Sequence, residues 1–242
     1  MYKRQIELLK ISSIIPTINE ANNLPLLLSD LSSIHKEGEI IIVDCGSEDK
    51  TIDIANIYGA KVCISKERNR GLQLDIGAKN SKGDWFIFLH ADTRLTDDWF
   101  RKINSVLEGD KDYIYYFKFK INHKKIIYRL LEFLVNFRSQ FFKQPYGDQG
   151  LIIQRTTYFE NNGFRKIPLM EDVDFLRRLN NKKILKQLNL PIFISSRKWE
   201  RTNIFLQAIK NWNFRRRWLK GCLLYTSPSP RDASVSRMPS SA

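Results

Sequence analysis

Short, largely apolar runs recur along the first part of the chain, and each ends in polar residues. Four of them have the length of strands buried on both faces, at residues 11–15, 39–43, 61–64 and 85–89. The segments between them carry apolar residues at helical spacing. Because strands and helices alternate, we predict an α/β fold with a mostly parallel central sheet, flanking helices and right-handed crossovers.

The pattern changes in the second half of the chain. Residues 113–120 alternate with a period of two, which predicts a half-exposed strand. Residues 124–142 predict a long amphipathic helix, with apolar residues at helical spacing at Ile127, Leu130, Leu131, Leu134 and Phe141. Residues 190–194 are expected to form a final edge strand, because Pro191 would interrupt the ladder of a central one.

Length and composition favour one folded unit. A chain of 242 residues with 43% hydrophobic content can build one large α/β domain or two small ones. Residues 222–242 are rich in Ser and Pro without periodicity, so we expect a disordered or non-native tail there. A single domain is therefore expected over residues 1–221.

The formal net charge of +14 suits a polyanionic partner, which could be nucleic acid, an anionic membrane or a phosphate-bearing substrate. We expect no nucleic-acid partner, because the chain carries neither paired zinc ligands nor an aromatic RNA-binding motif. The three cysteines have no paired spacing, which fits a reducing compartment. The sequence shows no signal-peptide pattern and no apolar run that could span a bilayer, so we expect a cytoplasmic protein.

Acidic residues stand where apolar runs or glycine turns end. Asp44 and Asp92 follow two of the predicted strands, Asp148 lies in a glycine turn, and Glu171 and Asp172 open a helix. Ligands of open α/β sheets bind outside the carboxyl ends of the strands. Carboxylates gathered at that edge suit Mg²⁺ or Mn²⁺, with positions left for phosphate oxygens.

Basic residues add a phosphate-binding element. Arg68 and Arg70 are expected in a loop just before a helix that begins at Leu72, where guanidinium groups and backbone N–H groups favour phosphate. Metal and phosphate ligands together indicate a nucleotide-linked substrate, and leave sugar transfer and phosphoryl or nucleotidyl transfer open. The chain has neither a P-loop nor a Gly-x-Gly-x-x-Gly motif, which disfavours P-loop kinases and dinucleotide dehydrogenases.

Five motifs carry a resemblance to a known family. Ser-Ile-Ile-Pro-Thr-Ile-Asn-Glu at 13–20, Ile-Val-Asp-Cys-Gly-Ser-Glu-Asp-Lys-Thr at 42–51 and Phe-Leu-His-Ala-Asp-Thr at 88–93 resemble the family 2 glycosyltransferases, which have the GT-A fold. Pro-Tyr-Gly-Asp-Gln-Gly at 145–150 and Met-Glu-Asp-Val at 170–173 resemble a bacterial branch of it. The similarity extends over about residues 11–221.

The resemblance implies a metal-dependent, inverting transfer of a sugar from a nucleoside diphosphate sugar. It assigns the metal, Mg²⁺ or Mn²⁺, to Asp92, with His90 standing where the first Asp of the family's Asp-x-Asp motif usually is. It assigns the catalytic base to Asp172, with Glu171 beside it. The residues that it places near the donor or acceptor are Pro16, Thr17, Glu20, Asp44, Arg70, Gln73, Ala91 and Asp148.

Two other functions are kept open. One is a basic module that binds polyanions or nucleic acid through charge alone. The other is a sugar-nucleotide pyrophosphorylase, although Pro-Thr-Ile-Asn at 16–19 is not the glycine-rich loop that such enzymes usually need. The acceptor is unknown. Residues 202–219 predict a basic helix bearing Trp212 and Trp218, which could lie on the inner membrane face and suit a lipid-linked acceptor, or could pack on its own domain.

Overall fold

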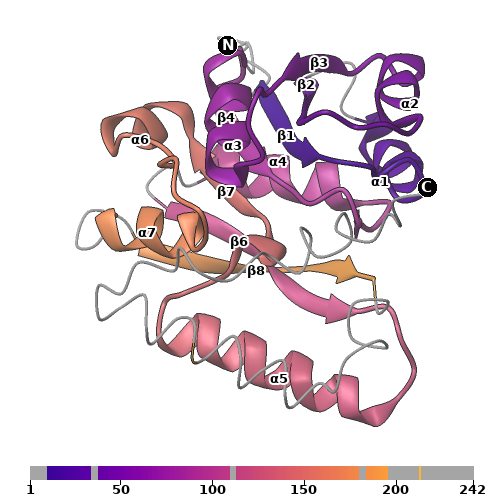
Figure 1. Ribbon diagram of the computed structural model, residues 1–242. Coiled ribbons are helices and arrows are strands. Elements are labelled where there is room, and N and C mark those ends of the chain that lie inside the picture. The colour runs from indigo at the N-terminus through magenta and orange to yellow at the C-terminus, as the bar shows by residue number, and fades with distance from the viewer. Residues whose placement is uncertain (1–9, 34–37, 110–112, 180–183, 196–212, 214–242) are drawn as a thin grey trace, which may run out of the picture.

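The computed structural model of the chain describes residues 10–33, 38–109, 113–179, 184–195 and 213 (Figure 1). The expected basic helix at 202–219, apart from residue 213, and the expected tail at 222–242 lie outside the described residues.

The first part of the chain alternates strands and helices, as the sequence predicts. The elements are β1 (Ile11–Thr17), α1 (Leu24–Leu31), β2 (Gly38–Asp44), α2 (Thr51–Ile57), β3 (Lys61–Ile64), α3 (Arg70–Lys79) and β4 (Trp85–Phe88). Strands β3, β2, β1 and β4 lie side by side in this order and are parallel. Their carboxyl ends therefore meet at one edge of the sheet.

The second part extends the same sheet. Its elements are β5 (Thr93–Arg94), α4 (Trp99–Gly109), β6 (Tyr113–Ile121), α5 (Ile126–Phe141), the 3₁₀ helix η2 (Gly147–Gln149), β7 (Leu151–Gln154), α6 (Arg155–Glu160), α7 (Glu171–Arg178) and β8 (Ile184–Ile194). The eight strands follow the order β3-β2-β1-β4-β7-β6-β8-β5. Strand β7 runs antiparallel to both β4 and β6, and β5 runs antiparallel to β8. The predicted α/β class with a mostly parallel sheet is confirmed.

Strand β4 shows why the sheet is buried on both faces. Trp85 and Ile87 belong to one hydrophobic core cluster, and Phe86 and Phe88 belong to the other. Successive side chains of a strand point to opposite faces, so a continuous apolar run supplies both cores. Helices α1 and α4 contribute to the first cluster, and α3, α6 and α7 to the second (Figure 1).

Two expectations for the later strands are wrong. Strand β6 is not half-exposed: Tyr115 and Tyr116 are both buried, because they belong to the two different core clusters that cover the two faces of the sheet. Burial raises the pKa of Tyr116 to about 12. Strand β8 begins at Ile184, so it is longer than expected, and it is not the last strand of the sheet, because the two-residue β5 pairs with Phe193 and Ile194 at its end. Pro191 is accommodated close to a register shift in the β6–β8 pairing.

Helix α5 forms as predicted, and the side that faces the sheet is mixed. Its buried residues are Tyr128, Glu132 and Ser139, and Leu131 and Val135 pack partly buried against the first core cluster. Leu130, on the other side, is about half exposed. The polar residues on the inward side are explained by the hydrogen bonds that the helix makes with β6.

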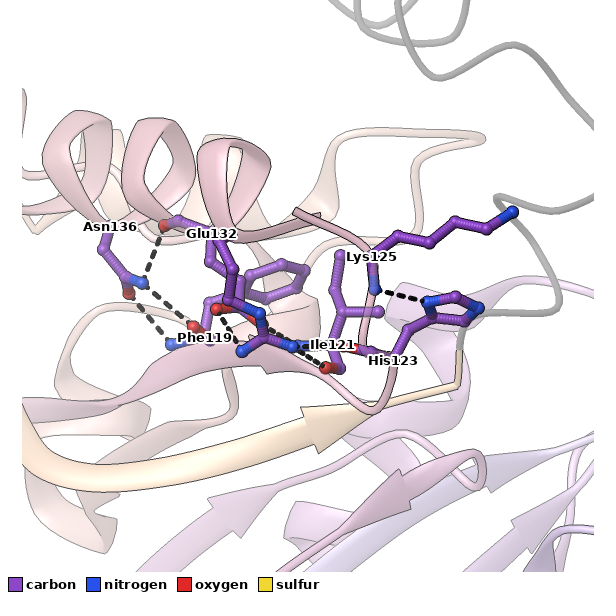
Figure 2. Close-up of polar contacts among 7 residues, drawn as sticks. Phe119, Ile121, His123, Lys125, Glu132 and Asn136 are labelled. Atoms are coloured by element: carbon purple, nitrogen blue, oxygen red, sulfur yellow. Dashed lines mark hydrogen bonds and ion pairs between the residues drawn. The ribbon is translucent and has the colours of Figure 1, made fainter. Parts of the chain in front are cut away.

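Figure 2 shows these bonds. Strand β7 pairs with β6 at Tyr115 and Tyr116, and farther along β6 the side chains of α5 bond the strand's backbone instead. Asn136 accepts a hydrogen bond from the Phe119 N–H and donates one to the Phe119 carbonyl oxygen, both at 2.9 Å. Glu132 accepts one from the Ile121 N–H at 2.6 Å. Polar residues face inward here because backbone groups need partners.

We therefore expect Asn136→Ala to lower the free energy of unfolding by about 1–3 kcal/mol, since it leaves backbone groups of Phe119 without their partner. Urea unfolding followed by circular dichroism measures this. Asn56→Ala is the matched control, because Asn56 is an exposed residue of α2. Equal stability of the two variants would show that α5 is held by other contacts.

Candidate active site

The loop after β2 is built around a buried carboxylate. Asp44 is fully buried, and it accepts hydrogen bonds from the Thr17 hydroxyl at 3.0 Å, from the Ser47 N–H at 2.8 Å and from the Ser47 hydroxyl. These bonds fix the end of β1 against the loop that follows β2. Asp44 lies outside the residues that line the pocket described next, so its direct contact with a nucleotide stays a prediction.

A second carboxylate joins the same two segments. Asp49 accepts hydrogen bonds from the N–H groups of Ala21 and Thr51, each at 3.0 Å. Burial acts to raise the pKa of Asp49, but the hydrogen bonds from Thr51 and Ala21 outweigh it and lower that pKa. The Thr51 hydroxyl in turn accepts a hydrogen bond from the Glu20 N–H at 2.8 Å. The segment from Asn19 to Ala21 is thereby held in place beside the sheet edge.

A first pocket opens at the carboxyl edge of β1 and β4. Its lining residues come from the end of β1, from the segments after β1 and β4, and from the start of α3, and they are Pro16, Thr17, Ile18, Glu20, Arg70, Gln73, His90, Ala91 and Asp92. Most of the residues that the sequence assigned to the donor and the metal therefore converge. Gln73 donates hydrogen bonds to the carbonyl oxygens of Val43 at 2.8 Å and Thr17 at 3.1 Å, which ties α3 to both strands.

The metal-binding prediction rests on His90 and Asp92, which are both partly buried in this pocket. Within the described residues, no cluster of three or more His, Cys, Asp or Glu side chains is placed to hold a metal ion. One carboxylate and one imidazole do not make a closed structural zinc site. They do fit Mg²⁺ or Mn²⁺, since such ions take the rest of their ligands from substrate phosphates and water.

Arg70 lies in the first turn of α3, and not in a preceding loop as expected. The helix begins two residues earlier than Leu72, because the Asn69 side chain accepts a hydrogen bond from the Leu72 N–H at 2.9 Å and caps the helix. Asn69 also donates to the Ile167 carbonyl oxygen at 2.9 Å. The cap sets the guanidinium of Arg70 beside the N-terminal end of α3, where the helix dipole favours anions.

A second pocket lies on the other side of Arg70. It is lined by Arg70, Leu74, Phe88, Leu89, Pro145, Tyr146, Gly147, Gly150, Leu151, Phe164, Asp172 and Leu176. Arg70 thus belongs to both pockets, and its Nη1 lies 3.0 Å from Oε1 of Glu171. Glu171 is 4% exposed, so the pair fixes the guanidinium at the boundary of the pockets.

Gly147 connects Arg70 to the predicted base. Its N–H donates a hydrogen bond to Oδ2 of Asp172 at 2.7 Å. A Cβ atom at this position would lie 2.0 Å from Nη2 of Arg70, so the guanidinium occupies the space that any side chain would need. The sequence analysis assigned no role to Gly147 or Tyr146, although both lie in the motif at 145–150.

Asp172 stands in the first turn of α7, after a strained residue. Met170 has φ 66°, a left-handed conformation that non-glycine residues adopt at an energetic cost. Asp172 also accepts a hydrogen bond from the Val173 N–H at 2.8 Å. Asp148 lies in η2 and lines neither pocket, so its contact with an acceptor stays a prediction.

The sequence matches the model of the Glycosyl transferase family 2 over residues 12–171, which is more than half of the chain. The protein therefore belongs to the family 2 glycosyltransferases. An uncharacterized glycosyltransferase of Rickettsia typhi is 38% identical over 120 residues, which cover 48% of this chain and 38% of the relative. A PGL/p-HBAD biosynthesis glycosyltransferase of Mycobacterium bovis is 36% identical over 91 residues, which cover 35% of this chain and 36% of the relative. The matched parts span well under half the length of these relatives.

Solved structures show the same fold. S. aureus TarS 1-349 in complex with UDP superposes with a TM-score of 0.62 at 20% identity, over 77% of this chain and 60% of the other. Glucosyl-3-phosphoglycerate synthase from Mycobacterium tuberculosis, in complex with Mg²⁺ and UDP, superposes with a TM-score of 0.55 at 17% identity, over 76% of this chain and 70% of the other. These structures establish the predicted GT-A fold for this chain.

Proposed function

We propose that the protein transfers a sugar from a nucleoside diphosphate sugar to an acceptor hydroxyl, with inversion at the anomeric carbon. The position of Arg70 carries this proposal. Arg70 lines both pockets, of which the first is also lined by Asp92 and His90 and the second by Asp172. A diphosphate in the first pocket and a hydroxyl in the second would meet beside a fixed cation. Family membership and the UDP complexes of the structural neighbours support the choice of donor.

The donor pocket supplies charge for the leaving group. Arg70 offers a cationic fork, and its pairing with Glu171 keeps it oriented without a rearrangement when the diphosphate forms. Asp92, with His90 beside it, would hold a divalent ion. When bound, such an ion neutralises charge on the departing diphosphate. Pro16, Thr17 and Glu20 would line the nucleoside end of the same pocket.

Asp172 would act as the general base. Oδ2 accepts the Gly147 N–H, which orients the carboxylate and leaves further lone pairs for an acceptor hydroxyl. The acceptor oxygen forms a bond to the anomeric carbon, and its proton passes to Asp172. The bond from that carbon to the diphosphate oxygen breaks, and the electron pair leaves with the nucleoside diphosphate. Attack from the face opposite the leaving group inverts the configuration.

The test is a thermal-shift panel of UDP-, GDP- and dTDP-sugars with and without Mn²⁺. We expect one nucleotide class to raise the melting temperature by about 5 °C near a hundredfold excess over its dissociation constant, and to need Mn²⁺ for the full effect. Only ligands that bind the folded state produce such a rise.

Heparin is the control for charge alone, because the chain carries a net charge of +14. A module that binds polyanions would be stabilised by heparin with a steep salt dependence and without Mn²⁺. If heparin stabilised the protein in that manner and no sugar nucleotide did, the glycosyltransferase proposal would be overturned.

A further inference from the structure

The outward side of α5 is an apolar surface with no covering element among the described residues. We call it the α5 face, and it consists of Ile126, Leu130, Phe133, Leu134, Phe137 and Phe141. These residues recur at the three- and four-residue spacing of one helix side, opposite the buried Tyr128, Glu132 and Ser139. Isolated exposed apolar residues are ordinary, but a contiguous patch marks a docking surface.

Aromatic rings on the α5 face form a stacked row. The rings of Phe133 and Phe137 have centroids 6.2 Å apart, and those of Phe137 and Phe141 have centroids 5.5 Å apart with planes only 10° from parallel. Phe133 is 65% exposed and Phe141 is 70% exposed, so most of this aromatic area is open to solvent.

Charge around the α5 face has one sign. Between residues 113 and 147 the single acidic residue is Glu132, which is buried against β6 and paired with Arg129. Exposed basic residues stand at both ends of the helix, with Lys124 and Lys125 before it and Lys143 after it. An apolar stripe bordered by cations is typical of helices that lie in the interface of an anionic bilayer.

We propose that α5 docks the protein on an anionic membrane surface, with the aromatic row in the acyl boundary and the basic residues at the lipid headgroups. Charge complementarity favours this occupant over two others. In a dimer formed through this face, the basic residues around the α5 face of one copy would approach those of the other and repel them. Residues 196–221 of this chain have Glu200 as their single acidic residue, so they too would bring like charge. No described helix has the length and apolar character of a membrane span, so α5 would lie along the surface.

The contacts on the inward side of α5 make this docking compatible with a stable fold. Glu132 and Asn136 hold the helix to β6 through backbone hydrogen bonds, so the α5 face is not needed to attach it (Figure 2). The helix also leads directly into Pro145, Tyr146 and Gly147, which line the pocket of Asp172. Docking would therefore bring that pocket close to the bilayer. The proposal does not depend on the proposed sugar transfer.

The test is co-sedimentation of the full chain with vesicles at low salt. Vesicles of equal parts phosphatidylcholine and phosphatidylglycerol should bind the protein, and pure phosphatidylcholine vesicles should bind it far less. The variant Phe133→Gln/Phe137→Gln/Phe141→Gln should lose about tenfold or more in vesicle affinity, because it removes the aromatic area that inserts. Its melting temperature should stay close to that of the parent protein.

The matched control is Leu26→Gln/Ile57→Gln/Ile64→Gln, which removes three exposed apolar side chains from other elements. It should bind vesicles like the parent protein. Absence of vesicle binding by the parent chain would overturn the proposal and would point to coverage by the chain's own residues. A phenylalanine variant that binds vesicles as well as the parent protein would also overturn it, and a change of that variant from dimer to monomer would favour a second copy. Neither result would bear on sugar transfer.

Discussion

Asp172→Asn should lower the rate of sugar transfer by about a thousandfold while nucleotide binding stays within about twofold of the parent protein. The amide cannot take the acceptor's proton, yet its oxygen can still accept the Gly147 N–H, so the local structure should persist. Nucleotide binding is preserved because Asp172 lines the second pocket and not the one that holds Asp92. Release of nucleoside diphosphate measures transfer, and isothermal titration calorimetry measures binding.

Asp53→Asn is the matched control for this variant. Asp53 also stands in the first turn of a helix, but it is exposed and lies outside both pockets. It should transfer sugar at the parent rate. Near-normal turnover by Asp172→Asn would mean that another group accepts the proton, and the assignment of the base would have to be abandoned.

The strands of the first half could be predicted because each is a short run of apolar residues, which indicates burial on both faces without knowledge of its neighbours. Trp85 to Phe88 is apolar at every position, and the structure uses both faces of that run. Strand β6 shows the limit of the same reasoning. Its alternating pattern suggested one solvent-exposed face, but each face packs in a core cluster. Both clusters include residues of β7 and β8, which lie at least thirty positions farther along the chain.

Helix α5 was predicted correctly, but its orientation was not predicted. The spacing of its apolar residues predicted the helix, but this spacing does not show which side of the helix faces the sheet. The deciding fact is the backbone of β6 beyond Tyr116, whose N–H and carbonyl groups bond Asn136 and Glu132. Because these backbone groups need partners, polar side chains share the inward side of α5 with Leu131 and Val135, which pack against the core. A sequence pattern cannot show this until the strand partners are known.

The candidate site was predicted residue by residue from motifs, and the structure adds the contacts between motifs. The boundary position of Arg70 arises from Glu171 on one side and Gly147 on the other, at sequence separations that no local rule spans. Asp44 shows the same kind of addition. Its motif predicts contact with the nucleotide, which stays a prediction, and the structure adds its bonds to Thr17, which lines the pocket, and to Ser47.

Asp92→Ala should abolish the part of nucleotide affinity that depends on Mn²⁺. Asp92 is the carboxylate that follows β4 in the first pocket, and the described residues offer no fuller set of metal ligands that could replace it. With Mn²⁺ present, we expect UDP to bind at least about tenfold more weakly, a loss of about 1.4 kcal/mol. Without Mn²⁺, the variant and the parent protein should bind UDP equally. Calorimetric titration under both conditions separates the two contributions without relying on turnover.

Asp97→Ala tests whether loss of any nearby negative charge has the same effect. Asp97 is exposed, lies five residues farther along the chain and does not line the pocket. It should keep the full response to Mn²⁺. If Asp92→Ala and the parent protein gained the same affinity on adding Mn²⁺, the ion would be held elsewhere or not at all. The donor pocket would then depend on Arg70 alone to neutralise the diphosphate, and the metal-dependent form of the proposed reaction would fail while the role of Asp172 could still stand.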